Sequence, residues 1–238
     1  MKQLSYSAAE IDERLGRVDK LSNPNLLINP FFQINQRGIS SSSNAGYTVD
    51  GWRLMASGHM VEVMPDKSLK VTASSSAGLA YALAQYVENY SDYEGKTVTI
   101  SALIEANTTT KGIRLRWAGE GSERIYGTGL HHVTITIPSV ISDLNFGIQF
   151  WDKNADNGNY FIIKGMKVEL GEISTLANDA PPKIATDLAE CQRYFRLWKT
   201  EAARTAALNE VGLMRLAAPT LGTISIGGVT YYTASAEL

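Results

Sequence analysis

Between residues 25 and 170, apolar and polar side chains alternate along the chain with a period of two. The alternation is clearest at residues 98–104, 113–117, 133–137 and 144–150, and weaker runs cover residues 59–64, 68–73 and 80–88. A period of two predicts β-strands that hold one face in a core and turn the other toward solvent or a second layer. Short strands with polar turns between them, and no helices in alternation, favour a mainly β fold, a jelly-roll β-sandwich.

The last run of this region changes its parity partway along. Phe161 and Ile163 have one parity, whereas Met166, Val168 and Leu170 have the other, and Gly165 lies at the change. An extra residue beside a glycine is typical of a β-bulge. We therefore expect a bulged strand that ends near residue 170.

Before residue 23 the apolar spacing is that of a helix. Alternating steps of four and three connect Leu4, Ala8, Ile11, Leu15 and Val18. This spacing predicts a short coiled-coil helix over residues 1–22, and the alternative is a single amphipathic helix packed on its own domain. Pro24 ends the helix, because proline cannot continue it.

The third region, residues 176–238, begins with a linker that contains paired prolines. Helical spacing of apolar residues then predicts one helix over Ala185–Ala207. Two alternating runs on either side of Gly227-Gly228 predict a terminal β-hairpin. The chain is therefore divided into a helix at 1–22, a sandwich at 23–175 and a helix-plus-hairpin unit at 176–238.

Charge and cysteine content limit which kinds of partner and which cellular compartment fit the chain. Lys plus Arg is 22 and Asp plus Glu is 24, with no basic run, so a nucleic-acid partner is disfavoured. The single cysteine, Cys191, excludes an intrachain disulfide framework and fits a buried structural thiol. No secretory signal is apparent, and no stretch approaches the roughly 20 apolar residues that span a bilayer.

Catalytic patterns are not visible in the sequence. His59, His131 and His132 are the only histidines, and the last two point to opposite faces of a strand. No nucleophile elbow, zinc-protease motif or phosphate-binding glycine loop occurs. We therefore expect a protein that is not an enzyme and that needs no cofactor.

A calcium site is an alternative for the segment WDKNADNGNY. Its oxygen-bearing side chains at alternate positions are Asp152, Asn154 and Asp156. An EF-hand loop needs glycine at position six and glutamate at position twelve, where this chain has Asn157 and Ile163. A polar turn between two strands is the competing interpretation.

A candidate glycan site follows from the polar parity of two strands. Trp151 and Gln149 share one parity, as Arg114 and Arg116 do on another strand, so the four side chains could line one sheet face. An aromatic ring stacks on the apolar face of a sugar, and amide and guanidinium groups bind its hydroxyls. The alternative is an outer face buried by another subunit. Tyr126 and Tyr160 are further candidates, whereas Trp52 and Trp117 are predicted to lie in the core.

Several ordered segments resemble tail-fibre and prophage tail proteins of bacteriophages. They are NLLINPFFQINQRG at residues 25–38, YTVDGW at 47–52, KVELG at 167–171 and ECQRYF at 190–195, with Met214-Arg215 and Pro219-Thr220 downstream. The resemblance implies a jelly roll similar to carbohydrate-binding modules, displayed as a homotrimer. Relatives commonly continue with more strands, so the C-terminal unit is expected to be truncated or completed by neighbouring subunits.

These observations predict a non-enzymatic tail-fibre, receptor-binding or structural tail protein. Its expected location is the virion after assembly in the host cytoplasm, and its expected partners are other tail proteins and host surface polysaccharide. The alternative is a carbohydrate-binding module of a non-viral surface or enzyme system, and a glycan depolymerase ranks below both.

Overall fold

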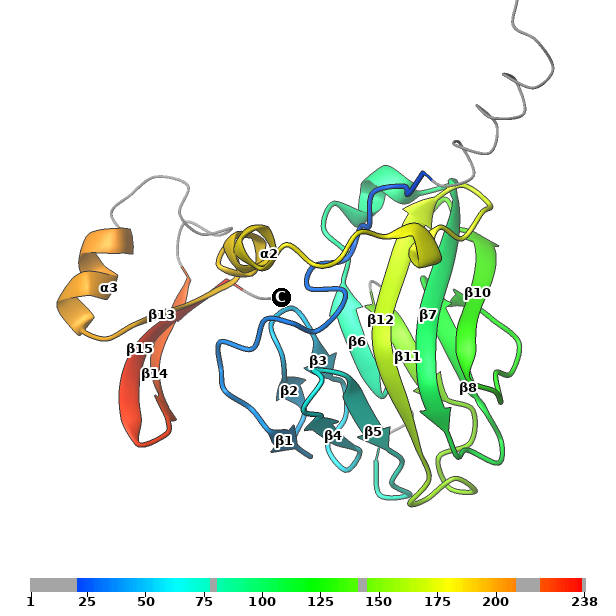
Figure 1. Ribbon diagram of the computed structural model, residues 1–238, viewed down its shortest axis with the longest axis horizontal. Helices are drawn as coiled ribbons and strands as arrows, with labels where there is room; N and C mark the ends of the chain where they lie inside the picture. Colours follow the sequence, from blue (N-terminus) through cyan, green and yellow to red (C-terminus); the bar gives the residue numbers. More distant parts are fainter. Residues whose placement is uncertain (1–20, 78–80, 141–144, 209–218, 237–238) are drawn as a thin grey trace, which may run out of the picture.

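The computed structural model describes residues 21–77, 81–140, 145–208 and 219–236. The heptad positions Leu4 to Val18 lie outside these ranges. Most of the described chain forms two antiparallel sheets of six strands each, packed face to face as a jelly-roll β-sandwich (Figure 1). A smaller unit of two helices and a three-stranded sheet follows at the C-terminus.

The β12 sheet is the front layer in Figure 1. It contains, in spatial order, β1 (Ser41–Ser42), β4 (Met60–Val63), β5 (Leu69–Thr72), β12 (Tyr160–Leu170), β7 (Thr97–Asn107) and β10 (Gly129–Thr136). The β11 sheet lies behind it. It contains β2 (Gly46–Tyr47), β3 (Arg53–Leu54), β6 (Leu83–Tyr86), β11 (Asn145–Phe150), β8 (Ile113–Trp117) and β9 (Glu120–Gly121). The predicted mainly β sandwich is confirmed, and the very short strands β1, β2, β3 and β9 are additions that alternation did not predict.

The core fills the space between the two sheets with the apolar members of the alternating runs. Trp52 and Trp117 are fully buried, as predicted. The Trp52 ring packs edge-on against Phe32 and Phe146, with centroids 5.2 Å and 6.2 Å apart. Edge-to-face packing of large rings adds to the gain from their burial.

The predicted bulge in β12 is confirmed. Its pairing with β7 shifts register between Ile162 and Ile163 and again between Ile163 and Gly165. A Cβ atom at Gly165 would lie 2.6 Å from Cδ1 of Phe31. The Phe31 ring therefore occupies the space that a side chain at position 165 would need. The bulge thus lets the opening segment of the chain lie against β12.

Buried polar groups connect the two opening motifs. The Asn29 amide donates to the carbonyl oxygens of Ile34 and Asp50, and the Trp52 indole donates to the carbonyl oxygen of Asn29. Burial raises the pKa of the Asp50 carboxyl, while the nearby Arg37 guanidinium, 3.4 Å away, lowers it. These residues of NLLINPFFQINQRG and YTVDGW therefore stabilise the fold and are not presented to a ligand.

The single helix predicted over Ala185–Ala207 is wrong. The structure has α2 (Ile184–Cys191), then β13 (Phe195–Trp198), then α3 (Glu201–Leu208). The aromatic segment between the helices pairs with β15, and its Phe195 ring packs under the Arg37 guanidinium at 3.7 Å. A partner strand and a docking site, both distant in sequence, override the helical spacing.

The predicted terminal hairpin is confirmed as β14 (Thr220–Ile226) and β15 (Val229–Ser235). Gly227 and Gly228 both have positive φ, 57° and 79°, as a type I′ turn requires. The sheet order is β13-β15-β14.

The C-terminal unit contacts the sandwich through the segment around Phe195. The Gln36 amide donates to the Phe195 carbonyl oxygen at 2.8 Å, and Arg193 forms an ion pair with Glu88 at 2.9 Å. The linker that leads there includes η2 (Leu176–Asn178) and crosses in front of the β12 sheet (Figure 1). No helix in the described ranges is long and apolar enough to cross a membrane.

Candidate functional site

The structure brings the four side chains of the predicted glycan site together on the outer face of the β11 sheet. Arg114 on β8 is opposite Gln149 on β11 in the strand register. The side-chain Oε1 of Gln149 accepts three N–H groups: Nε and Nη2 of Arg114, at 3.0 Å and 2.8 Å, and Nη1 of Arg116, at 3.0 Å. Residues separated by more than thirty positions in the chain thus form one polar cluster.

Trp151 extends this cluster just beyond the end of β11. Its backbone N–H donates to the Gly112 carbonyl oxygen at 2.9 Å, which holds the segment against β8. The side chain is 37% exposed, and two guanidinium groups lie over its ring: Arg114 at 5.3 Å and Arg124 at 4.4 Å from the centroid. The ring therefore holds arginines by cation–π contact, a role that the parity argument did not predict.

Arg124 is the main member of the site that sequence reasoning missed. Ile125 forms a bridge with Ile113 beyond the end of β9, so Arg124 and Tyr126 lie on the same face as Arg114. A Cβ atom at Gly112 would meet both side chains at 3.3 Å, which places them beside each other. Tyr126 is 50% exposed. In the sequence, the apolar Ile125 between Arg124 and Tyr126 was the only sign that these two side chains share a face. A pairing of one residue is too short to be predicted from alternation.

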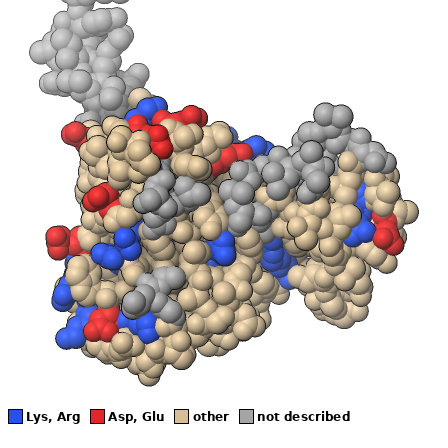
Figure 2. Space-filling model, turned by 180° about the vertical axis from the view of Figure 1, so that it is seen from behind, with Lys and Arg blue, Asp and Glu red and all other residues tan. Residues whose placement is uncertain are grey.

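We call Arg114, Arg116, Arg124, Tyr126, Gln149 and Trp151 the arginine face. Arg114, Arg116 and Arg124 make no ion pair with a carboxylate in the part of the chain that the structure describes. Burial lowers the pKa of Arg114, and the neighbouring charge of Arg116 lowers it further. Figure 2 views the molecule from this side, where basic side chains are spread over the middle of the sandwich and most acidic ones lie toward its rim.

Small residues lie beside the arginine face toward β3. The strand register aligns Arg53, Ala84, Gly147 and Arg116 in one row across the sheet. A Cβ atom at Gly147 would be 2.1 Å from the Leu83 carbonyl oxygen, so the row has no room for a larger side chain there. At its far end the Arg53 guanidinium lies 5.5 Å and 5.3 Å from the ring centroids of Tyr47 and Tyr86.

The predicted calcium ligands lie in a polar turn after β11. Asp156 is fully buried, and its carboxylate accepts hydrogen bonds from Thr110, from the Lys111 backbone and from the Asn159 amide. The Asp152 carboxylate accepts from the backbone N–H groups of residues 154 and 155. These contacts are those of the polar turn that was the competing interpretation. No cluster of three or more His, Cys, Asp or Glu side chains suited to a metal ion occurs in the described ranges.

His59 lies in the sandwich interior, near one end of the core. It is 1% exposed, its Nδ1 accepts the Ser74 backbone N–H at 3.1 Å, and its ring is 5.1 Å from that of Phe150. Burial, with a smaller effect of the Lys153 charge, lowers its pKa from 6.5 to about 4. His59 is therefore neutral near pH 7 and acts as a packed core residue.

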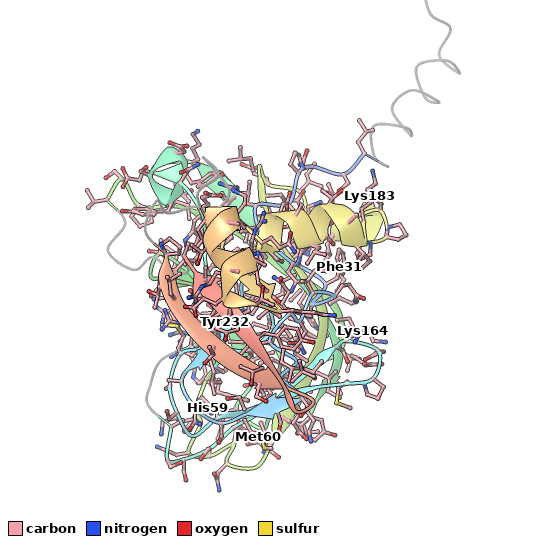
Figure 3. The ribbon with its side chains drawn as sticks, turned by 90° about the vertical axis from the view of Figure 1, so that its left-hand side faces the viewer. Phe31, His59, Met60, Lys164, Lys183 and Tyr232 are labelled. Carbon is pink, nitrogen blue, oxygen red and sulfur yellow. The ribbon has the colours of Figure 1, made fainter. Side chains whose placement is uncertain are left out.

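A hollow of about 360 Å³ lies between the sandwich and the start of α2. Phe31, Gln33, Asp66, Ser68, Lys164, Pro182 and Ile184 line it. Figure 3 shows Phe31 and Lys164 on the side of the sandwich below α2. Lys164 is already paired there with Glu105 at 2.8 Å and with Asp66 at 3.5 Å, so the hollow presents no unbalanced charge on that side.

Comparison with known proteins finds similarity in structure only. No protein-family profile and no curated protein matches the chain. A Clostridium thermocellum xylanase with CBM22-1 and GH10 modules, solved with xylohexaose, aligns over 64% of this chain and 30% of its own, at 11% identity and a TM-score of 0.39.

Two smaller structures show likeness of the same order. The CBM22-1 xylan-binding domain of a Paenibacillus barcinonensis xylanase aligns over 64% of this chain and 98% of its own, at 11% identity and a TM-score of 0.35. A family 29 carbohydrate-binding module aligns over 62% and 95%, at 14% identity and a TM-score of 0.33. Similarity at this level identifies neither a family nor a ligand for this chain.

Proposed function

We propose that this protein is a non-enzymatic carbohydrate-binding protein whose ligand site is the arginine face of the β11 sheet. The observation that carries the proposal is the convergence of guanidinium, amide and aromatic groups from β8, β11 and the segment at residues 124–126. Such groups are well suited to a sugar, because hydroxyls accept N–H donors and C–H faces stack on rings.

The structure changes how the sugar would be held. Two arginines lie over the Trp151 ring, so that ring positions guanidinium groups. Tyr126 is the more exposed ring of the arginine face and serves as the stacking surface in this proposal. Donors from Arg114, Arg116 and Arg124 then bind the oxygens of the sugar.

The test is affinity electrophoresis of the full chain through gels that contain single polysaccharides, followed by titration calorimetry with each retarding one. We expect Tyr126→Ala to weaken binding about tenfold, the scale of one lost stacking contact. Trp151→Ala should weaken it as much by releasing Arg124. Tyr160→Ala on the β12 sheet is the matched control and should bind as the wild type does. No retardation by any polysaccharide, or equal binding by all variants, contradicts the proposal.

A second candidate function, display at the end of an oligomeric stalk as in a tail protein, is favoured by how the chain enters the sandwich. The fully buried Lys167 ammonium donates to the hydroxyls of Ser22 and Thr175 and to the Asp179 carboxylate. The segment that follows the predicted N-terminal helix and the linker to the C-terminal unit are thereby held at the same end of the sandwich (Figure 1). Both could continue into a shared axis.

Sedimentation of the full chain tests the stalk. We expect a trimer at micromolar concentration and a monomer for Ile11→Lys, because a charge in a heptad seam opposes helix pairing. Lys20→Glu, outside the heptad positions named above, is the control. A monomeric wild type contradicts the stalk and leaves the glycan proposal standing.

A further inference from the structure

The arginine face has more guanidinium N–H donors and positive charge than the acceptors and carboxylates of the described residues can pair. Three N–H groups from two neighbouring guanidinium ions converge on one neutral oxygen, Oε1 of the Gln149 side-chain amide. A carbonyl oxygen has two lone pairs, so this acceptor is shared beyond its capacity. Arg114 and Arg116 also repel each other, since their positive charges are held close together without a carboxylate in the described part of the chain.

Two further guanidinium donors lack acceptors within the described ranges. Arg124 stacks on Trp151 at 4.4 Å and makes no hydrogen bond to a described residue. The Nε of Arg116 is buried and has no acceptor either, although its Nη2 donates to the Gly119 carbonyl oxygen at 3.0 Å. Buried polar groups normally find partners, so the unmet Nε of Arg116 indicates that something else supplies an acceptor there, and the exposed Arg124 guanidinium beside the same cluster is accessible to that group.

Arginine is also the residue type suited to one particular acceptor. Its planar fork of N–H groups matches the two oxygens of a carboxylate, and such pairs are stronger than bonds to neutral oxygens. Trp151 holds the Arg124 guanidinium over its ring, with Cζ 4.4 Å from the centroid, so less conformational entropy is lost when the fork binds. Tyr126, beside Arg124, adds an exposed ring at the edge of the same cluster.

We propose that the arginine face binds acidic sugars, with the carboxylate of a uronate residue held by the guanidinium groups of Arg114 and Arg124 and its ring against Tyr126. The inference rests on the proposed glycan binding and names the substrate class for that site. The carboxylate supplies the acceptor that the single oxygen of Gln149 cannot, and it neutralises the repulsion between the arginines.

The test compares each acidic polymer with its neutral counterpart on the full chain. Polygalacturonate, alginate and hyaluronate are titrated beside the same polymers after carboxyl reduction, which removes the charge and keeps the sugar backbone. We expect at least one acidic polymer to bind about tenfold or more tightly than its reduced form. That preference should shrink as salt is raised, because screening weakens ion pairs that are partly exposed.

Variants then assign the preference to this face. Arg124→Gln removes the charge at an exposed position where folding is not at risk, and it should abolish most of the difference between acidic and reduced polymer. Arg124→Lys keeps the charge without the fork and should restore only part of it. Lys70→Gln, on the opposite sheet, should keep the full preference.

The outcomes separate this inference from the proposal beneath it. Equal binding of acidic and reduced polymers, still lost in Tyr126→Ala, overturns the acidic preference and retains glycan binding. Preference for single-stranded DNA or dextran sulfate over every uronate polymer overturns the inference in favour of a general anion site. Absence of binding to any polymer overturns both.

Discussion

The outer faces of the two sheets use basic residues in opposite ways. Every lysine or arginine on a strand of the β12 sheet pairs with a carboxylate: Lys70 with Glu62, Lys164 with Glu105 and Asp66, and Lys167 with Glu169 and Asp179. On the β11 sheet, Arg114 and Arg116 are instead held by an amide and by aromatic rings. One face neutralises its charge internally, and the other leaves it available.

For Lys167, the pairing follows from what covers its face of the sheet. The linker after β12 lies on the β12 sheet, where Ser174 bonds Ser101 at 2.7 Å and the Thr99 hydroxyl donates to the Gly171 carbonyl oxygen at 2.8 Å. Charges under such a cover must be paired, because a lone buried charge is costly. The net charge of −2 therefore hides an asymmetry between the faces.

The largest expected effect is on the covered side. Lys167→Met leaves the buried Glu169 and the Asp179 carboxylate without their cation, so we expect the free energy of unfolding to fall by about 3–5 kcal/mol. Urea denaturation followed by tryptophan fluorescence measures this loss. The control is Lys70→Met, which breaks a partly exposed pair and should cost about 0.2–1 kcal/mol. Equal losses would show that the cover does not bury the Lys167 cluster.

Next in size is the close packing of the β11 sheet beside the arginine face. Gly147→Ala would place Cβ 2.1 Å from the Leu83 carbonyl oxygen and 2.8 Å from Ala84 Cα, both backbone atoms. We expect a loss of about 2–3 kcal/mol, as for overpacked cores, measured by the same denaturation. In Gly127→Ala the new Cβ would meet only the His131 ring, at 3.8 Å, so this control should be near neutral.

The burial of His59 should appear in the pH dependence of stability. The unfolded histidine titrates near 6.5 and the folded one near 4, so the unfolded state binds more protons between these values. Stability is therefore fully present above pH 6.5 and falls as the pH drops toward 4, by about 2–3 kcal/mol. His59→Asn keeps an acceptor for Ser74 and should lack this slope. An identical slope in the variant would assign the acid sensitivity to other groups.

The smallest expected effect compares one basic residue from each face. Lys70→Gln should lower the free energy of unfolding by about 0.5 kcal/mol, because it breaks an ion pair. Arg114→Gln should change it by less than about 0.5 kcal/mol, since relief of repulsion from Arg116 offsets the lost bonds to Gln149. Thermal melts of the two variants and the wild type at low salt measure both changes. A clear loss in Arg114→Gln alone would mean that the arginine face stabilises the fold and is not available for a ligand.

The candidate site was predictable only as far as strand parity extends. Parity placed Arg114, Arg116, Gln149 and Trp151 on polar faces of their strands, and the register of β8 against β11 then brought them together. Parity could not reveal that Arg124 lies over Trp151, because Arg124 is outside a regular strand. Only the isolated pairing of its neighbour Ile125 with Ile113 places it beside the ring.

Period-two alternation was enough, by itself, to determine the sandwich and its buried rings, because each strand must hide one face and alternate positions share that face. The glycines at residues 227 and 228 likewise determined the hairpin, since few other residues adopt its turn. Tertiary structure alone decided that residues 195–198 are a strand, because β15 and Arg37 supply its partners. It also decided which face keeps its charge: pairing with a carboxylate depends on what lies across the sheet, and that is set by long-range contacts.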